Sequence, residues 1–282
     1  RMILVNVAAG WCHWCHVMDH ETYGDPAVAR LIAERFVPVR VDADARPDVA
    51  ERYARWGWPA NAVLTPDARP VTERRGYQPP ARFLALLTEL SDAHAAGRPL
   101  ARSAAPPPPP VRDLDEVTAA LRAQLDAFYD HAQEGWGAGQ KYPFAAPIEH
   151  ALLRAAVRAD EAPWRERALA TLRAQLALMD PVWGGMFQYS DDGTWGGGRH
   201  WEKIVPIQTG ALEAYCLAYQ VTGDASWLEP ARELRRYLVE RLRAPDGTFF
   251  ASQDADPPAG SGMDGRAFYA LDDADRRAAP AA

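Results

Sequence analysis

The sequence predicts two domains of different class, an α/β domain followed by an all-α domain of helical hairpins. Three observations carry this prediction. Strand and helix signals alternate over roughly the first hundred residues, a run of five prolines follows, and amphipathic helices dominate the rest. Consecutive prolines cannot join a helix or an inner strand, so they form an extended spacer. We therefore expect domains at 1–97 and 112–282, joined by a proline-rich linker at 98–111.

The elements of the first domain have local signals. Asp25 and Pro26 are typical of a helix start, and apolar residues recur at helical spacing after them. Runs rich in β-branched residues predict strands between the helical segments. The predicted strands are 2–7, 37–42, 61–66 and 69–77, and the predicted helices are 25–36, 46–56 and 79–95.

The second domain shows no convincing strand signal. Its loops at 134–144, 180–198 and 244–256 resemble one another, because each combines glycine, aromatic and acidic residues and they are spaced by roughly one helix pair. We therefore expect repeated helical hairpins whose loops form a rim that suits a sugar. The predicted helices are 112–132, 146–160, 163–179, 205–222 and 226–243.

Composition limits the classes of partner. The 282 residues carry a net charge of −7, and no apolar run approaches the roughly 20 residues of a membrane span. We therefore expect no nucleic-acid and no membrane partner. Three cysteines do not make a disulfide framework. The compartment stays open: cytoplasmic, or extracytoplasmic if a signal peptide lies upstream of the abrupt start of the chain.

The segment Cys12–His16, with the sequence CHWCH, allows three chemistries. It satisfies the C-x-x-C-H pattern of haem attachment, but no other motif marks an axial ligand. A structural zinc site needs a second pair of ligands, and the remaining cysteine, Cys216, lies in an apolar helical segment. A redox dithiol needs only a strand and then C-x-x-C opening a helix, which is the context here. The residues favour redox chemistry, without a metal or a cofactor.

In this interpretation each residue of the motif has a role. Cys12 lies at the helix start, where unpaired backbone N–H groups favour a thiolate, and is the attacking sulfur. Cys15, one turn later, resolves the mixed disulfide. His13 adds positive charge beside the thiolate, and His16 tunes the same pair.

The first domain resembles a thioredoxin. The segment ILVNVAAGWCHWC (3–15) has the strand, the tryptophan Trp11 and the dithiol of that family, and RYARWGWPANAVLTPDARPV (52–71) resembles its later helix and hairpin. The resemblance implies that Pro59 is a cis-proline opposite the dithiol, and that Trp11 and Pro59 shape the substrate groove.

A narrower resemblance covers both domains. The segments CHWCHVM (12–18), VDADARPD (41–48) and GWP (57–59) resemble the thioredoxin-like domain of the YyaL and spermatogenesis-associated protein 20 group, DUF255. That group joins this domain to an (α/α)6 toroid similar to N-acylglucosamine 2-epimerases and six-hairpin glycosidases. In the second half, KYPF (141–144), HWEK (200–203), AYQVTGD (218–224) and SQDAD (252–256) resemble the group's segments in the same order.

Two departures bear on the mechanism and the fold. Thioredoxins usually carry a buried aspartate six positions before the first cysteine, as a proton relay, and this chain has Asn6 there. A relay must then come from His13, His16 or water. A complete toroid has twelve helices and about five are predicted here, so we expect a partial toroid, from either a fragment or a reduced version of the fold.

The loops of the second domain contain a second candidate site. An imidazole, carboxylates and an amine could act as acid, base and hydroxyl partner, and tryptophan faces could stack on a sugar. The competing interpretation, that these residues pack loop against loop, is favoured by about two to one. The candidates are His200, Glu202, Lys203, Trp195 and Trp201, with Trp183 nearby and Asp254 and Asp256 from another loop.

The resulting expectation is a thiol–disulfide oxidoreductase that acts on protein dithiols and disulfides, with a six-hairpin-glycosidase-like helical domain that selects the partner. The alternative from another class is a carbohydrate-active or carbohydrate-binding protein, of the epimerase or glycosidase type, in which the first domain is a scaffold. A third interpretation is a non-catalytic interaction module controlled by redox state.

Overall fold

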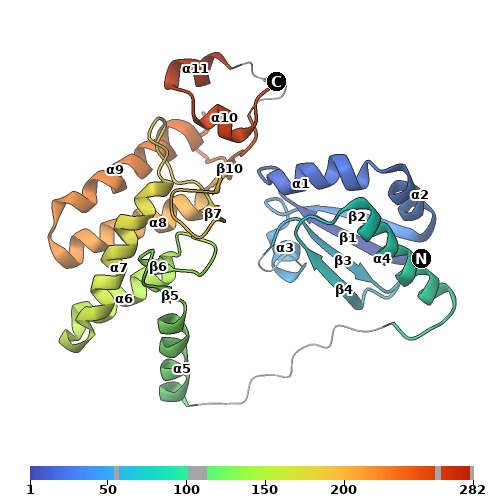
Figure 1. The fold of residues 1–282 in the computed structure, drawn as a ribbon, viewed down its shortest axis with the longest axis horizontal. Coiled ribbons are helices and arrows are strands. Elements are labelled where there is room, and N and C mark those ends of the chain that lie inside the picture. Colours follow the sequence, from blue (N-terminus) through green and yellow to red (C-terminus); the bar gives the residue numbers. More distant parts are fainter. Residues whose placement is uncertain (54–56, 101–112, 258–261, 280–282) are drawn as a thin grey trace. The chain divides into compact units, whose positions relative to one another are not determined.

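The computed structural model describes residues 1–53, 57–100, 113–257 and 262–279. The chain divides into two compact units, Arg1–Pro109 and Pro110–Ala282 (Figure 1). Most of the predicted linker, 98–111, falls within 101–112, outside the described residues. The first unit is an α/β structure and the second is helix-rich, which confirms the predicted fold class.

A mixed four-stranded sheet forms the centre of the first unit (Figure 1). Its strands are β1 (Met2–Ala8), β2 (Phe36–Asp42), β3 (Ala60–Leu64) and β4 (Pro70–Arg75), in the order β2-β1-β3-β4. β1 runs parallel to β2 and antiparallel to β3, and β3 runs antiparallel to β4. Because β1 is a central strand and almost wholly buried, its sequence is nearly continuous in apolar residues.

The helices of this unit are α1 (His13–Met18), which continues as the π-helix η1 (Asp19–Tyr23), then α2 (Pro26–Arg35), α3 (Pro47–Tyr53) and α4 (Pro80–Ala95). The carboxylate of Asp25 accepts the backbone N–H groups of Ala27 and Val28, at 2.8 and 3.0 Å, and Pro26 opens α2. This confirms the predicted helix start.

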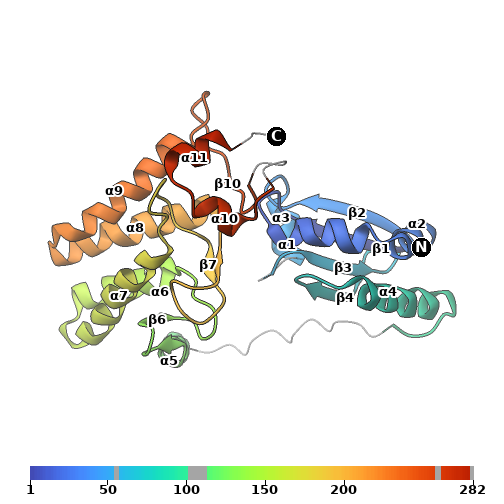
Figure 2. The ribbon, with the colours of Figure 1, turned by 45° about the horizontal axis from the view of Figure 1, so that its top comes forward.

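One apolar core holds the dithiol end of the unit in place. α2 and α4 pack against each other, while α3 contacts β2 and β3 (Figure 2). Full burial of a side chain such as Phe83 stabilises the fold by about 1.5–3 kcal/mol. Because Met18 of α1 belongs to the same core, the helix that follows the dithiol is anchored on the sheet. The core contains Met2, Leu4, Met18, Val28, Ile32, Phe36, Val63, Val71, Phe83 and Leu87.

The second unit consists of helices packed in pairs. Figures 1 and 2 show α6 against α7, α8 against α9, and α6 against α8. The α6–α8 approach is close, because a Cβ added at Gly210 would lie 3.0 Å from the Cβ of Ala145. The α-helices are α5 (Leu114–Ala127), α6 (Ala145–Val157), α7 (Ala162–Ala174), α8 (Val205–Thr222), α9 (Leu228–Tyr237), α10 (Gly265–Tyr269) and α11 (Asp273–Ala278). Short 3-10 or π turns are η2 (Ala159–Glu161), η3 (Gln175–Leu178), η4 (Ala225–Trp227) and η5 (Leu238–Leu242).

Two-residue strands pair in the loops of this unit, the first two pairs each within one loop and the third between two loops. These are β5 (Tyr129–Asp130) with β6 (Gly135–Trp136), β7 (Tyr189–Ser190) with β8 (Arg199–His200), and β9 (Lys203–Ile204) with β10 (Ser252–Gln253). Lys141 also bridges Ser190, so each of these loops is tied to the next. Strands this short need no alternation of apolar residues, which is why the sequence shows no strand signal here.

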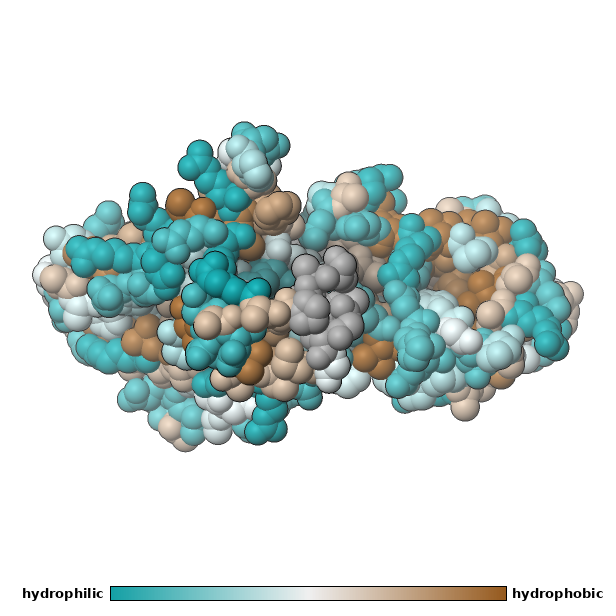
Figure 3. Space-filling model, turned by 90° about the horizontal axis from the view of Figure 1, so that it is seen from above, coloured by the Kyte–Doolittle hydropathy of each residue, from teal (hydrophilic) through white to brown (hydrophobic). Residues whose placement is uncertain are grey.

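The surface agrees with the predicted absence of long apolar runs. No helix in the described part of the chain combines the length and apolarity needed to cross a membrane. On the face drawn in Figure 3, hydrophilic residues alternate with smaller apolar areas.

Candidate functional site

Cys12 and Cys15 form a disulfide at the junction of β1 and α1. Cys12 is the N-cap of α1, as the sequence predicts, and the backbone N–H of Cys15 donates to its sulfur at 3.1 Å. A donor aimed at sulfur favours the charged form once the disulfide is opened. Cys15 is on the buried side of α1, with 1% of its surface exposed.

Trp11, which directly precedes Cys12, contacts the segment that carries a cis-proline. The Trp58–Pro59 peptide bond is cis, as the thioredoxin resemblance implies. The buried ring of Trp11 meets Trp58 edge-on at 5.8 Å. The carbonyl of Pro59 accepts the N–H of Gly76 at 2.8 Å, which attaches this loop to the end of β4. The structure thus brings Trp11 and Pro59 to the same part of the fold, with Trp58.

The pKa of the Asp44 carboxyl, in the loop after β2, is raised by burial and by neighbouring Asp42. A hydrogen bond from Trp11 acts in the opposite direction. This bond fixes the ring of Trp11 on the residues that follow β2.

Sequence reasoning did not single out Trp14 and Tyr77. Trp14, between the two cysteines, is 41% exposed, and its ring lies 5.9 Å from that of Tyr77. The Tyr77 hydroxyl donates to Glu21, and this bond raises the pKa of the phenol. A large exposed aromatic beside a dithiol is a typical contact point for a partner. The position of Trp14 inside C-x-x-C was an available signal, whereas nothing in the sequence marks Tyr77.

His13 and His16 lie beside the dithiol on α1 and are partly exposed. The ring of His13 meets Trp14 edge-on at 5.4 Å. Their tuning of the cysteine pair stays a prediction.

Amides occupy the sheet beneath α1. Asn6 of β1 donates from Nδ2 to Oδ1 of Asn61 on β3 at 3.1 Å, and the Tyr23 hydroxyl donates to the same oxygen at 2.5 Å. Burial raises the pKa of Tyr23, and Asp19 adds to this effect. At position 6, where thioredoxins usually carry an aspartate, this protein therefore has a network of neutral hydrogen-bonding groups instead of an acid.

In the second unit, the structure gathers several of the predicted candidates near Tyr189. The ring of His200 stacks on Tyr189 at 3.9 Å, and its Nε2 lies 3.2 Å from Asp191. Burial raises the pKa of Tyr189, and Glu202 and then Asp191 add to this effect. His200, Glu202 and Asp191 thus surround one phenol.

Lys203 lies apart from that cluster, inside the fold. Its fully buried ammonium donates to Asp180 at 2.6 Å and to the carbonyl of Gly184 at 2.8 Å. Burial lowers its pKa to about 8, against the opposing effect of Asp180. Arg276 reaches the same carboxylate at 2.7 and 3.1 Å. In this structure Lys203 braces the loop, and its amine is not presented to a sugar.

The first loop of the unit repeats this arrangement. Lys141 is fully buried and donates to Asp130 and to the carbonyl of Gly137, both at 2.6 Å. In each case an aspartate shortly after one helix binds a lysine shortly before the next α-helix, so the two lysines hold equivalent loops.

The predicted tryptophans pack within the loops. Trp195 is buried and donates to the carbonyl of Gln133 at 2.8 Å. Trp201 stacks on Tyr269 at 5.6 Å. Trp183 donates to Asp273 at 2.8 Å. These contacts support the competing, structural interpretation of the tryptophans.

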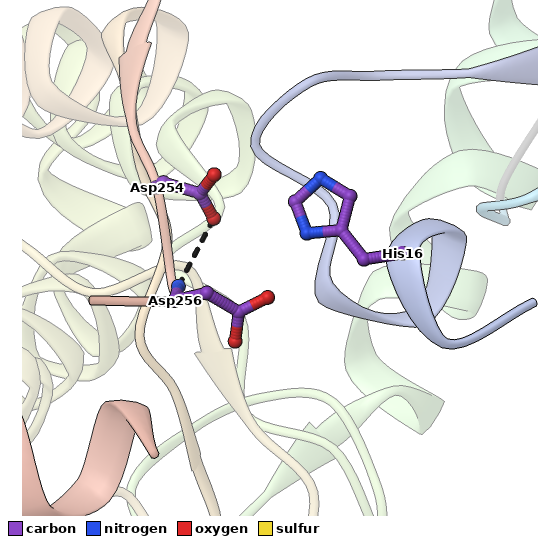
Figure 4. Close-up of side chains that lie close together, drawn as sticks. All are labelled: His16, Asp254 and Asp256. Carbon is purple, nitrogen blue, oxygen red and sulfur yellow. Dashed lines mark hydrogen bonds between the residues drawn. The ribbon is translucent and has the colours of Figure 1, made fainter. Parts of the chain in front are cut away.

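Asp254 and Asp256 lie in the loop after β10. The N–H of Asp256 donates to the carboxylate of Asp254 at 3.0 Å, as Figure 4 shows, and the Asp254 carbonyl accepts the Tyr269 hydroxyl at 2.8 Å. Figure 4 also draws His16, which comes from α1 of the first unit.

Comparison with known protein families identifies the first unit. Residues 1–99 match the family model Thioredox_DsbH, described as a protein of unknown function, DUF255. The first unit is therefore a thioredoxin-like domain of this family, as the sequence motifs imply.

Curated proteins match most of the chain. Human spermatogenesis-associated protein 20 is 28% identical over 312 residues, which cover 93% of this chain and 38% of that protein. An uncharacterized protein of Caenorhabditis elegans is 26% identical over 287 residues, which cover 91% of this chain and 39% of that protein. The chain thus spans less than two fifths of the length of these relatives.

Solved structures match the first unit. A thioredoxin from Thermus thermophilus is 31% identical and covers 34% of this chain and 78% of its own, with a TM-score of 0.32. The C-terminal domain of DsbD from Neisseria meningitidis, in the oxidised form, is 22% identical. The match covers 32% of this chain and 79% of that domain, with a TM-score of 0.28. The likeness of the second unit to a toroid or a glycosidase stays a prediction.

Proposed function

We propose that the protein catalyses thiol–disulfide exchange with protein dithiols and disulfides through Cys12 and Cys15. One observation carries the proposal: in a thioredoxin-like domain, the two cysteines form a disulfide at the start of α1, with the Cys15 N–H directed at the Cys12 sulfur. This arrangement supports an attacking thiolate and a resolving thiol one helical turn apart.

The exchange takes place in two steps. The Cys12 thiolate attacks a substrate disulfide, a mixed disulfide forms, and the first substrate sulfur leaves as a thiolate. Cys15 then loses its proton and attacks the Cys12 sulfur, so that the Cys12–Cys15 bond forms and the second substrate thiolate leaves. An external dithiol reduces the protein again, and the reverse sequence oxidises a substrate dithiol.

The residues around the dithiol have separate roles in this proposal. The amide N–H of Cys15 stabilises the Cys12 thiolate and lowers its pKa. Trp11 and Pro59 shape the substrate groove, and exposed Trp14 provides an apolar contact for the polypeptide next to the substrate disulfide. His13 and His16 add positive charge beside the sulfurs when protonated.

Reduction of insulin disulfides by dithiothreitol tests the proposal. We expect the wild type to accelerate the reaction, Cys12→Ser to be inactive, and Cys15→Ser to accumulate a mixed disulfide with substrate that mass spectrometry detects. Cys216→Ser is the matched control, because Cys216 is a free cysteine on α8 of the other unit, and it should retain full activity. Wild-type rates in Cys12→Ser would refute the proposal.

The second candidate function, carbohydrate binding, is favoured by the cluster of His200 and Glu202 around Tyr189, a combination of imidazole, carboxylate and aromatic face. Calorimetry of the full chain with a glycan panel tests it. Heat of binding that disappears in His200→Ala supports a sugar site, and unchanged heat in this variant, or none in the wild type, contradicts it.

A further inference from the structure

An aromatic pair, Trp14 and Tyr77, lies beside the dithiol. Trp14 is inside the ring that the Cys12–Cys15 disulfide closes, and its side chain lies 5.9 Å from that of Tyr77, at an interplanar angle of 41°. The N–H of Gly76, the residue before Tyr77, donates to the carbonyl of Pro59 at 2.8 Å. Tyr77 therefore follows directly on the residue that binds the cis-proline segment.

The segment that carries Tyr77 is fixed on η1. The hydroxyl of the buried Thr22 donates to the carbonyl of Gln78 at 2.7 Å, and the Tyr77 hydroxyl donates to the carboxylate of Glu21. Gln78 also donates from Nε2 to the carbonyl of Gly76 at 3.2 Å. These hydrogen bonds place a carboxylate at one end of the aromatic pair.

The Glu21 carboxylate is exposed, and no ion pair among the described residues includes it. The other acid at this part of η1, Asp19, pairs with Arg40, and the arginine that ends β4, Arg75, pairs with Glu73 at 3.7 Å. The hydrogen bond to Glu21 raises the pKa of the phenol, so the phenol stays neutral and the carboxylate keeps its negative charge.

An exposed indole beside a charged carboxylate suits a long basic side chain. Trp14 is 41% exposed, and the methylenes of arginine or lysine pack on apolar surface of this kind while the charged head stays at the polar edge. A guanidinium is also attracted to the faces of tryptophan and tyrosine, and it binds a carboxylate through two N–H groups. An acidic side chain at the same place would be repelled by Glu21.

We infer that Trp14, Tyr77 and Glu21 select substrates in which a basic residue, arginine above all, lies next to the reacting cysteine. The inference rests on the proposed exchange function and names its substrate class. Because Cys12 bonds to the substrate cysteine, the neighbours of that cysteine lie against the segment that contains Trp14. Glu21 is thus a specificity-determining residue and takes no part in the exchange of bonds.

Short peptide disulfides that differ at one position test the inference. The substrates are disulfide-linked dimers of the peptide Gly-X-Cys-Gly, capped at both ends, with arginine, glutamine, leucine or glutamate as X. Reduced protein is mixed with each dimer at about pH 8, where imidazoles of ordinary pKa are neutral and do not oppose a basic substrate. The released peptide is measured by chromatography after acid quenching. Each rate is divided by the rate of the same dimer with dithiothreitol, because the charge of X also alters the reactivity of the disulfide itself.

The arginine dimer should be the best substrate of the wild type. We expect its corrected rate to exceed that of the glutamine dimer about fivefold or more at low salt, and the glutamate dimer to be the slowest. Raising the ionic strength from about 0.01 M to about 1 M should weaken this preference, because salt screens an exposed pair of charges.

Substitutions of Glu21 isolate the contribution of its charge. Glu21→Gln retains an acceptor for the Tyr77 hydroxyl and should reduce the arginine preference to about twofold or less, whereas Glu21→Lys should reverse the preference in favour of the glutamate dimer. Glu34→Gln is the matched control and should keep the wild-type preference. It removes the same charge from an exposed residue of α2, next to the start of β2 and at the opposite end of the sheet from the dithiol.

The outcomes separate the inference from the function on which it rests. Equal corrected rates for the arginine and glutamine dimers in the wild type, or a leucine dimer faster than the arginine dimer, overturns the inference. An arginine preference that survives in Glu21→Lys overturns it as well. Failure of the wild type to reduce any of the dimers contradicts the proposed exchange function itself.

Discussion

Removal of the charge of Asp180 tests the structural assignment of Lys203. Asp180 is the carboxylate partner of two fully buried cations, Lys203 at 2.6 Å and Arg276 at 2.7 and 3.1 Å. Asp180→Asn keeps the size of the side chain but leaves both cations buried without an anion. Loss of one partner of a buried pair costs about 3–5 kcal/mol, and two stranded cations favour the upper end. At about 2–4 °C per kcal/mol for a unit of this size, Tm should fall by about 10 °C or more.

Differential scanning calorimetry of the full chain measures this effect, because the two units give separate transitions if they unfold independently. Only the transition of the helical unit should move. Asp160→Asn is the matched control: it removes the same charge from an exposed pair with Arg158, where the cost is within about 1 kcal/mol. A Tm for Asp180→Asn within about 2 °C of wild type would refute the assignment of Lys203 as a structural residue that holds the loop through Asp180.

Three further predictions follow from individual contacts. Lys203→Met should alter the pH dependence of stability. Folding lowers the pKa of Lys203 from 10.5 to about 8, so between these pH values the unfolded chain binds more protons than the folded chain, and the free energy of unfolding of the wild type rises with pH. Urea titrations of the variant should lack this rise. Asp25→Ala removes the acceptor of two backbone N–H groups and should lower the free energy of unfolding of the first unit by about 1 kcal/mol, measured in urea. Asp25→Asn is the control that retains the helix cap, and an equal loss of stability in both variants would contradict the cap. Trp14→Ala should raise KM for insulin about tenfold, and an unchanged KM would remove Trp14 from the substrate groove.

Features set by neighbouring residues could be predicted from the sequence. The cap at Asp25, the placement of Cys12 at the start of α1, and the change of fold class after the prolines all depend on local propensities. Each comes from residues a few positions apart, where spacing alone carries the information.

Contacts made through the sheet could not be predicted in the same way. Tyr77 reaches Trp14 from across the unit, and Asn6 meets Asn61 only because β1 and β3 pair in one register. Such pairs depend on the order and register of the strands, which cannot be predicted from a local sequence pattern.

The second unit shows a different limit. The letters of HWEK suggest acid, base and amine together, but the fold turns Lys203 inward to Asp180 and leaves His200 against Tyr189. A buried lysine with its partner 23 residues away reads the same in sequence as an exposed one. The short helices α10 and α11 were also missed, because they are too short for a clear apolar period, although Asp264 and Asp272 cap them.

The central claim is that Cys12 is an activated thiolate, and its pKa tests this most directly. The measurement is the rate of iodoacetamide alkylation against pH in a Cys15→Ser, Cys216→Ser variant, which retains the backbone N–H of residue 15. The account predicts a pKa below about 7.5, because that N–H and the helix start favour the anion. A pKa at or above about 8.5, the ordinary value of a free cysteine, would contradict it.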